Sequence, residues 1–312
     1  MAGPFVSVVI LTYRRREALI QALQSVRAQS YSQQEVVVAD NGSGDDLAQF
    51  LADHFPEVRF VGLTENGGCV GRNHGIEAAR GELVVTIDND LYFDSPFELQ
   101  KLVNAFQECP QASCIVFKVL EATSGNLHVR DWCHPYSYTG YADREFETCF
   151  IPEGACAFRR NHFLQAGGYF EPLWLGHEGW DLAVRMLDRG MHIFYRPSIR
   201  VRHLISSDTR TSWRPYYYYT RNYIWIALRH YSPGRALPYL VEKTGMMTYF
   251  AIRTNNLGAL GRGIRDGLRG VPAMLKTRKV LSSSTWFMLR ELGTNRPGIG
   301  ERLRRHRARP LV

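Results

Sequence analysis

Residues 83–90 read Leu83-Val84-Val85-Thr86-Ile87-Asp88-Asn89-Asp90. The first five are mostly β-branched and predict a strand buried on both faces, as in a parallel sheet. Carboxylates at the end of such a strand favour a ligand crevice, because burying them without a partner is costly. Asp88 and Asp90 point the same way on an extended chain and could share a divalent cation such as Mg²⁺ or Mn²⁺. Asp-Asn-Asp is also typical of a plain turn, so the neighbouring sequence has to decide.

Strands and helices alternate around this stretch. Strands are expected at 5–12, 35–39, 58–63 and 113–119, and helices at 16–28, 47–54, 70–79 and 96–106. This βαβ series predicts an α/β fold with a parallel sheet and helices on both faces. After residue 121 the pattern weakens. Residues 122–150 are expected to form an irregular segment or an antiparallel hairpin over the sheet. A helix is expected at 178–189, and Pro197 is expected to separate two short strands at 191–195 and 199–203.

Charge divides the chain into two parts. Residues 1–209 carry 18 Lys and Arg against 26 Asp and Glu, whereas residues 210–312 carry 20 against 4. We therefore expect an acidic catalytic domain at 1–209 and a mostly helical, basic extension at 210–312 that meets an anionic partner.

One helix face of the extension would gather cationic and aromatic side chains. Arg214, Arg221 and Arg229 fall on this face, with Trp225 and Tyr218 near them. Such a face suits an anionic membrane surface. The alternative is packing against the acidic domain. No recognised motif indicates nucleic-acid binding, so no nucleic-acid partner is expected.

The bulk properties favour a cytoplasmic protein. The chain has 312 residues, 45% of them hydrophobic, which is enough for a large core. No apolar run reaches the roughly 18 residues of a membrane helix, and the first apolar stretch precedes its basic cluster, unlike a signal peptide. Six cysteines without a CxxC pair indicate reduced thiols. We expect a cytoplasmic protein whose basic region can bind peripherally to the inner face of the cell membrane.

Two further segments suit a nucleotide ligand. Asp40 ends the second strand and could accept hydrogen bonds from a base or a ribose, although a capping or turn role is the alternative. The segment 66–75 joins a glycine-rich loop to a helix N-terminus and includes Arg72. Its N–H groups favour an anionic ligand such as a diphosphate. The segment fits neither a Walker loop nor the dinucleotide fingerprint.

Taken in order, these motifs resemble family 2 of the glycosyltransferases. The resemblance rests on Val8-Val9-Ile10-Leu11-Thr12-Tyr13-Arg14-Arg15, Val37-Val38-Ala39-Asp40-Asn41-Gly42-Ser43, Asn66-Gly67-Gly68 with Gly71-Arg72-Asn73-His74-Gly75, and Ile87-Asp88-Asn89-Asp90. It covers about residues 5–205. It implies an inverting enzyme with the GT-A fold, a Rossmann-like domain for nucleoside diphosphate sugars.

The resemblance also implies roles for single residues on the donor side. Thr12, Tyr13 and Asp40 would line the nucleoside pocket, Arg72 and Asn73 would flank the donor, and Asp88-Asn89-Asp90 would be the DxD motif. Within that motif, Asp88 and Asn89 would face the nucleotide sugar and Asp90 would bind the metal. His203, at the end of a strand, matches a late histidine of the family that approaches the metal and the diphosphate. A structural histidine is the alternative.

The acceptor side departs from the family pattern. The family usually has a Glu-Asp pair at the start of a helix, with the Asp as catalytic base. This chain reads His177-Glu178-Gly179-Trp180-Asp181, so Gly179 replaces the expected base. Glu178 and Asp181 remain as candidate bases, with Glu178 favoured, and Trp174, His177 and Trp180 could form an acceptor wall. The alternative for both carboxylates is to complement the helix dipole.

The resulting prediction is transfer of a sugar from a nucleoside diphosphate donor to an acceptor hydroxyl, with Mg²⁺ or Mn²⁺ as cofactor. The acceptor would be a surface polysaccharide or a lipid-linked glycan. Two alternatives stay open. One is a degenerate glycan-binding relative without turnover, suggested by Gly179, and the other is a nucleotidyltransferase, which also uses carboxylates and a metal.

Overall fold

The computed structural model describes residues 3–44, 46–204 and 213–292. Its first half is the predicted βαβ series. The strands β1 (Val6–Thr12), β2 (Gln34–Asp40), β3 (Arg59–Gly62) and β4 (Leu83–Asp88) are parallel, in the spatial order β3-β2-β1-β4. The helices α1 (Arg16–Arg27), α2 (Leu47–His54) and α3 (Val70–Ala78) connect them. These elements confirm the predicted strands and helices to within two residues at each end.

The second half makes the sheet mixed. β8 (Ala155–Arg159) runs antiparallel between β4 and β6 (Ala112–Glu121), and β9 (His192–His203) is parallel to β6. The short β5 (Leu91–Phe93) and β7 (Phe146–Glu147) both pair with β9 in antiparallel fashion. The predicted parallel sheet is thus formed by β1 to β4, and the second half of the chain adds antiparallel strands to it. The segment 122–150 is irregular, as expected, with the short helices η1 (Val129–Asp131) and α5 (Tyr138–Tyr141).

The prediction that Pro197 separates two strands was wrong. β9 is continuous from His192 to His203, and its register against β6 shifts where Arg196 pairs with Phe117 and Arg200 pairs with Lys118. A proline is tolerated at such an irregularity because it cannot donate a ladder hydrogen bond. The bulge carries the strand on to His203, at the same edge of the sheet as β5.

The strand register decides where the polar residues meet. Thr12 on β1 pairs with Asp40 on β2, and Leu11 pairs with Asp88 on β4. The carboxyl ends of the three strands therefore lie at one edge, where ligands of open α/β sheets bind.

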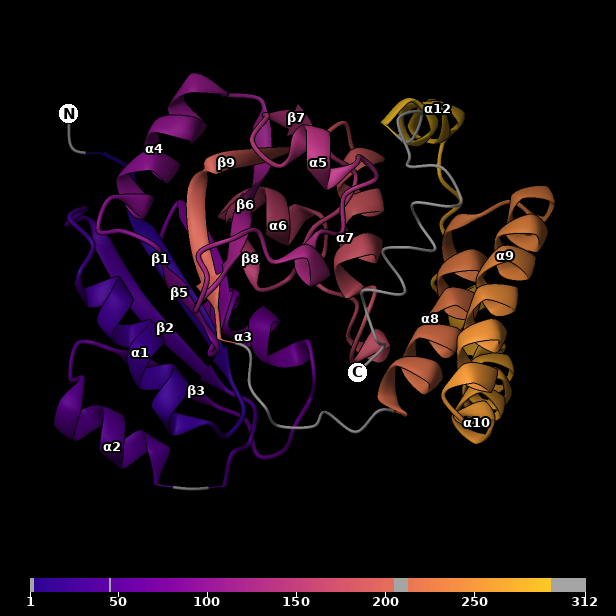
Figure 1. Ribbon diagram of the computed structural model, residues 1–312, viewed down its shortest axis with the longest axis horizontal. Coiled ribbons are helices and arrows are strands. Elements are labelled where there is room, and N and C mark those ends of the chain that lie inside the picture. The colour runs from indigo at the N-terminus through magenta and orange to yellow at the C-terminus, as the bar shows by residue number, and fades with distance from the viewer. Residues whose placement is uncertain (1–2, 45, 205–212, 293–312) are drawn as a thin grey trace.

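Helices cover both faces of the sheet (Figure 1). One core cluster includes buried residues of α1, α2 and α4 (Glu98–Glu108), such as Leu19, Leu51 and Leu102. The other includes residues of α3, α6 (Arg160–Gln165) and α7 (Glu178–Leu187), such as Ile76, Phe163 and Leu182. The short η2 (Glu171–Leu173) precedes α7.

The C-terminal region is helical, as predicted. It contains α8 (Arg214–His230), α9 (Pro233–Arg253), α10 (Leu257–Arg269), α11 (Val271–Lys276) and α12 (Ser283–Leu292). In Figure 1, α8 lies next to α7, with α9 and α10 on its outer side. Among the described helices, none combines the length and the apolar composition that a membrane crossing requires. The predicted domain boundary at 209/210 lies outside the described residues.

Candidate active site

A hydrogen-bond network joins the ends of β1 and β4. The Asn89 amide donates to Thr12 Oγ1 at 2.9 Å and to the Arg14 carbonyl at 3.1 Å. Arg14 and Arg15 have positive φ angles of 57° and 59°, which is uncommon outside glycine. Strained backbone of this kind is concentrated at ligand sites. Thr12 and Asn89, both predicted donor-side residues, are thus brought together.

Asp40 extends this network through Ser43. Its carboxylate accepts the Ser43 N–H at 3.1 Å and the Ser43 hydroxyl, and Ser43 Oγ in turn accepts the Arg14 N–H at 2.7 Å. This is the turn geometry that the sequence left as the alternative for Asp40. Asp40 is buried, whereas the predicted nucleoside-pocket residue Tyr13 is 37% exposed at the same edge.

Asp88 is paired with a buried arginine. Arg72, on α3, donates to Asp88 Oδ1, and the Asp88 side chain stays 36% exposed. Burial lowers the pKa of Arg72, but Asp88 and other acids outweigh this and keep the guanidinium charged. A fixed cation next to a solvent-accessible carboxylate can orient an anionic ligand at this edge.

Asn73 has a different place from the one predicted. Its amide nitrogen donates to the Tyr169 carbonyl at 2.9 Å, and its oxygen accepts the Tyr169 N–H at 2.9 Å. Both ends of the amide therefore hold the loop after α6 on α3. Asn73 thus fixes the position of α3, and with it the position of Arg72. Its amide is used for this backbone contact.

The glycine-rich loop is held by Asn41. The Asn41 amide donates to the Gly68 carbonyl at 2.8 Å and accepts the Gly67 N–H at 3.2 Å. Gly68 has a φ of 63° and lies directly against the carbonyl of Trp174, so a side chain there would collide with backbone. The loop thus connects the donor edge to the segment that precedes α7.

Asp90 and His203 form the candidate metal centre. Asp90 Oδ2 lies 3.7 Å from His203 Nε2 and 2.8 Å from Arg15 Nη1. Two ligand atoms at this separation, a carboxylate oxygen and an imidazole nitrogen, fit one divalent cation. The mixed donor set suits Mn²⁺ better than Mg²⁺, which prefers oxygen ligands. The residues present therefore fit the cofactor that the sequence predicts.

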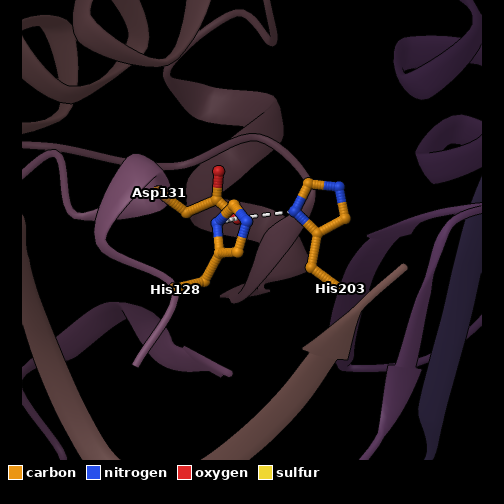
Figure 2. Close-up of side chains that lie close together, drawn as sticks. All are labelled: His128, Asp131 and His203. Carbon is orange, nitrogen blue, oxygen red and sulfur yellow. Dashed lines mark hydrogen bonds and ion pairs between the residues drawn. The ribbon is translucent and has the colours of Figure 1, made fainter. Parts of the chain in front are cut away.

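A second carboxylate orients His203 (Figure 2). Asp131 Oδ2 lies 2.7 Å from His203 Nδ1 and 2.8 Å from His128 Nδ1. With Nδ1–H directed at Asp131, the Nε2 atom of His203 is left facing Asp90. Such a carboxylate–histidine pair is the usual support for a metal-binding imidazole. His128, Asp131 and His203 also form a compact group of three side chains with metal-ligating atoms.

The two histidines, His128 and His203, hold Asp131 in its charged form, and Asp131 in turn helps to keep His203 charged. Burial would raise the pKa of Asp131, but His128 and His203 hold it well below its usual range. Burial lowers the pKa of His203, and Asp131 and Asp90 outweigh this and raise it to about 10. A cation that binds here therefore replaces a proton on His203.

The acceptor side is formed by α7 and the segment before β8. Glu178, in the first turn of α7, is buried, and its Oε2 has no hydrogen-bond partner among the described residues. Burial, and then the charge of Glu153, raise the pKa of Glu178 to about 8. Glu153 is only partly buried, and its Oε1 accepts the Gly179 N–H at 2.6 Å. Two carboxyl groups therefore meet where the resemblance places one catalytic Asp.

Asp181 has a structural place, which corrects its expected role as a second candidate base. It is fully buried and accepts from Arg185 at 2.8 Å, from His230 at 2.7 Å and from Arg229. Burial would raise the pKa of Asp181, but these three side chains keep it far below its usual range. A carboxylate with no exposed oxygen cannot reach an acceptor hydroxyl.

The basic face of α8 also differs from the expectation of a membrane surface. Arg229 binds Asp181, and Arg221 is buried, with hydrogen bonds to the carbonyls of Pro172 and Leu173 at 3.1 and 2.7 Å. The neighbouring Asn222 donates to the carbonyls of Leu173, Leu175 and Gly176. Arg214 alone of the three predicted arginines is exposed. The face therefore packs on the catalytic domain, which was the alternative, and it orders the loop before α7.

A cavity of about 680 Å³ opens between this loop and the C-terminal helices. His177 and Trp180, two residues of the predicted acceptor wall, line it together with aromatic and basic side chains of α8, α9 and α12 that include Tyr223, Tyr239, Trp286, Arg235 and Arg290. The third, Trp174, instead stacks on Tyr218 and donates to the Asn66 carbonyl at 3.1 Å.

Sequence reasoning missed Arg15, Asp131 and Glu153. Arg15 follows the first strand in the quoted motif, but its contact with Asp90 depends on the strained turn at 14–15. Asp131 lies in the irregular segment, where no periodic pattern guides an assignment. Glu153 precedes Gly154 in the sequence and belongs to none of the motifs that predict the donor side. Glu153 lies 26 residues from Gly179 in the chain, so only the fold brings the two together.

Comparison with known proteins relates the chain to one family. The profile described as glycosyl transferase family 2 matches residues 7–166. The uncharacterized glycosyltransferase YwdF of Bacillus subtilis is 26% identical over 188 residues, covering 58% of this chain and 67% of YwdF. The uncharacterized glycosyltransferase alr2836 of Nostoc sp. is 30% identical, covering 50% and 51%. Several other curated relatives are much longer, and the match covers only 17% of chondroitin synthase from Escherichia coli.

Solved structures share the fold. A structure of S. aureus TarS 1-349 in complex with UDP-GlcNAc has a TM-score of 0.61 at 16% identity, covering 93% of this chain and 88% of that one. A structure of GalNAc-T7 with UDP, GalNAc and Mn²⁺ also has a TM-score of 0.61, at 16% identity, covering 77% and 50%. PcManGT from Pyrobaculum calidifontis, in complex with GDP-Man and Mn²⁺, has a TM-score of 0.55 at 18% identity, covering 94% and 86%. The chain belongs to glycosyl transferase family 2 and has the GT-A fold of a glycosyltransferase, with a helical C-terminal region.

Proposed function

We propose that the protein transfers a sugar from a nucleoside diphosphate donor to an acceptor hydroxyl, with inversion at the anomeric carbon. The observation that carries this proposal is the pair of carboxylates Asp88 and Asp90 at the end of β4, beside buried Arg72 and His203. The matched relatives include proteins whose structures hold UDP, UDP-GlcNAc or GDP-Man, which supports a nucleoside diphosphate sugar as donor.

The donor would lie across the carboxyl ends of β1, β2 and β4. Tyr13 and the Thr12–Asn89 network would border the nucleoside, while Asp40 shapes that pocket through Ser43. Asp88 would face the ribose and sugar side, with Arg72 fixing its carboxylate. Arg15 and Arg72 place positive charge near the departing diphosphate, which favours the charge that develops in the transition state.

Asp90 and His203 would hold the divalent cation, with Asp131 setting the His203 ring. When bound, Mn²⁺ or Mg²⁺ would offset the negative charge of the leaving diphosphate. In the absence of the cation, Arg15 neutralises Asp90.

The acceptor would enter from the side of α7. The cavity lined by His177, Trp180 and the C-terminal helices combines aromatic faces with Arg235 and Arg290. These groups suit a glycan or a lipid-linked acceptor that carries a phosphate. Surface polysaccharide or glycolipid synthesis is the role that we propose on this basis. Glu178 is the base that the sequence predicts for this side.

The proposal includes peripheral binding to an anionic membrane. The contact surface would be on α9, because two of the three α8 arginines face the rest of the protein. Leu237, Val241 and Ile252 fall on one face of α9 and are 67%, 66% and 62% exposed. Exposed apolar side chains in a strongly basic region suit an anionic lipid surface at the cytoplasmic face. We expect L237E/V241E to lose sedimentation with phosphatidylglycerol vesicles. Unchanged sedimentation at low salt would remove this part of the proposal.

The test of the function is product analysis. We would incubate the protein with Mn²⁺ and UDP-GlcNAc, UDP-GalNAc or GDP-mannose, select the donor that raises the melting temperature, and identify the released nucleotide. The proposal predicts a nucleoside diphosphate and a product of inverted configuration. Pyrophosphate would indicate a nucleotidyltransferase. Binding without turnover would indicate a glycan-binding relative, and no binding of any nucleotide sugar would contradict the proposal.

A further inference from the structure

Position 179 has no space for the catalytic side chain that the family usually carries there. A Cβ atom added to Gly179 would collide with the carbonyl oxygen of Ile151, which is backbone and cannot move aside easily. The same Cβ would lie 2.6 Å from Glu153 Oε1. The end of the Glu153 side chain therefore lies where a side chain of residue 179 would begin.

The strand pairing places Glu153 beside the donor edge. β8 runs antiparallel to β4 with Ala155 opposite Ile87, so residues 153 and 154 follow along the end of β4. A Cβ added to Gly154 would lie 2.5 Å from Asp88 Oδ2, so only glycine allows this approach. Thr86 Oγ1 donates to the Glu153 carbonyl at 2.7 Å and fixes the backbone. Glu153 thus lies between Asp88 and the N-terminus of α7.

Access separates Glu153 from Glu178. Glu178 is 3% exposed, and its Oε2 is buried without a hydrogen-bond partner among the described residues. Glu153 is partly exposed, and one of its oxygens is held by the Gly179 N–H. A general base has to come within hydrogen-bond distance of the proton that it removes. Glu153 meets this condition without a rearrangement of the helix, whereas Glu178 does not.

We propose that Glu153 is the catalytic base of the acceptor side and takes the place of the side chain that Gly179 lacks. This inference rests on the glycosyl transfer proposed above. The Glu153 carboxylate takes the proton of the acceptor hydroxyl, and the acceptor oxygen bonds to the anomeric carbon. The bond from that carbon to the diphosphate oxygen breaks, and its electron pair leaves with the diphosphate. Glu153 then releases the proton to solvent.

The surroundings prepare Glu153 for this step. Burial raises its pKa, which makes it a stronger base, while Arg72 and the Gly179 N–H oppose the rise and keep the ionised form accessible. The N-terminus of α7 adds a favourable dipole. Glu178, whose pKa is raised to about 8, keeps its proton at neutral pH, so the pair carries one negative charge. Glu178 is then a positioning residue behind Glu153.

A purely structural role for Glu153 makes a different prediction. Its carboxylate also caps the second N–H of α7, a role that a glutamine oxygen can fill. E153Q therefore keeps most of the cap and removes the basicity. If Glu153 only caps the helix, E153Q retains turnover. E153A, which lacks the capping oxygen, then mainly lowers the melting temperature.

The experiment compares the wild-type chain with E153Q, E153A and E178Q. The readout is release of nucleoside diphosphate from UDP-GlcNAc, UDP-GalNAc or GDP-mannose with Mn²⁺, with a methyl glycoside or water as acceptor. We expect E153Q to lose about 100-fold or more in rate, as for other general bases, with the Kd for the nucleoside diphosphate unchanged within about twofold. E178Q is expected to lose less than about tenfold.

Sodium azide adds a direct readout of proton removal. Azide needs no base to attack the anomeric carbon, so it should restore nucleoside diphosphate release by E153A at least about tenfold and leave the wild type almost unchanged. Full turnover by E153Q, or loss in E178Q alone, would overturn the assignment while leaving the proposed function intact. A wild-type protein that turns over none of the donors would overturn both.

Discussion

The donor edge and the acceptor wall are built in different ways. At the donor edge, Thr12, Asp40 and Asp88 end three parallel strands and meet because of the strand register. At the acceptor wall, the first turn of α7 is arranged by residues far away in the sequence. Glu153 holds Gly179, while Arg221 and Asn222 of α8 hold the loop that precedes the helix.

Substitutions in the two regions should therefore have different effects. At the donor edge Asp40 and Asp90 are buried, but the Asp88 side chain is 36% exposed, so substitution of Asp88 should alter chemistry more than folding. At the acceptor wall the carboxylates that the sequence singles out are buried, so substitutions there should alter stability. Because α8 orders the segment before α7, we infer that the C-terminal helices belong to the proposed catalytic unit.

The largest effects are expected when an Asp is replaced by Asn, at Asp88 on the donor edge and at Asp181 on the acceptor side. D88N should lower turnover by about 10²- to 10³-fold, because a charge that acts in the transition state is lost. It should lower the melting temperature less than D181N does, because the Asp88 side chain is 36% exposed and pairs with one buried arginine, Arg72. D181N should lower the free energy of unfolding by about 3 kcal/mol, because Arg185 and Arg229 are left without their buried partner. Enzyme kinetics and urea denaturation measure the two quantities. A D181N protein of wild-type stability would contradict the comparison.

The next effect concerns the metal. D131N should weaken Mn²⁺ binding by about 10- to 100-fold, because the His203 ring loses the carboxylate that orients it. D143N is the control, since Asp143 is exposed in the same irregular segment and pairs with Lys118. Calorimetric titration with Mn²⁺ and UDP measures the affinity. Equal affinity in D131N and D143N would mean that Asp131 does not support the site.

The smallest effect is a change of stability with pH. The pKa of Glu178 rises from 4.5 in the unfolded chain to about 8 in the fold. Below pH 4.5 both states hold the proton, between pH 4.5 and 8 only the unfolded state loses it, and above pH 8 the full penalty applies. E178Q removes this penalty and should be more stable at pH 8 by on the order of 2 kcal/mol, with no gain at pH 4. A difference that does not vary with pH would show that Glu178 is not buried as described.

The sequence predicted the strands that end at the donor edge, because their signals are local. A β-branched run followed by Asp88 and Asp90 indicates the strand and the point where it ends, and four such motifs in order predict the fold. The acceptor wall was less predictable because its contacts join residues that are far apart. The Asp181 ion cluster depends on helix α8, 48 and 49 residues away, and the inward face of the α8 arginines depends on the same packing. Pro197 was misread because a register shift absorbs it.

Binding of UDP and GDP by wild type, D90N and E153Q, in the presence and absence of Mn²⁺, separates the donor edge from the acceptor wall. We expect the wild type to bind a nucleoside diphosphate only with Mn²⁺, D90N to lose this dependence and most of the affinity, and E153Q to bind like the wild type. A D90N protein with unchanged Mn²⁺-dependent binding, or an E153Q protein that no longer binds, would contradict the division into a donor edge and an acceptor wall.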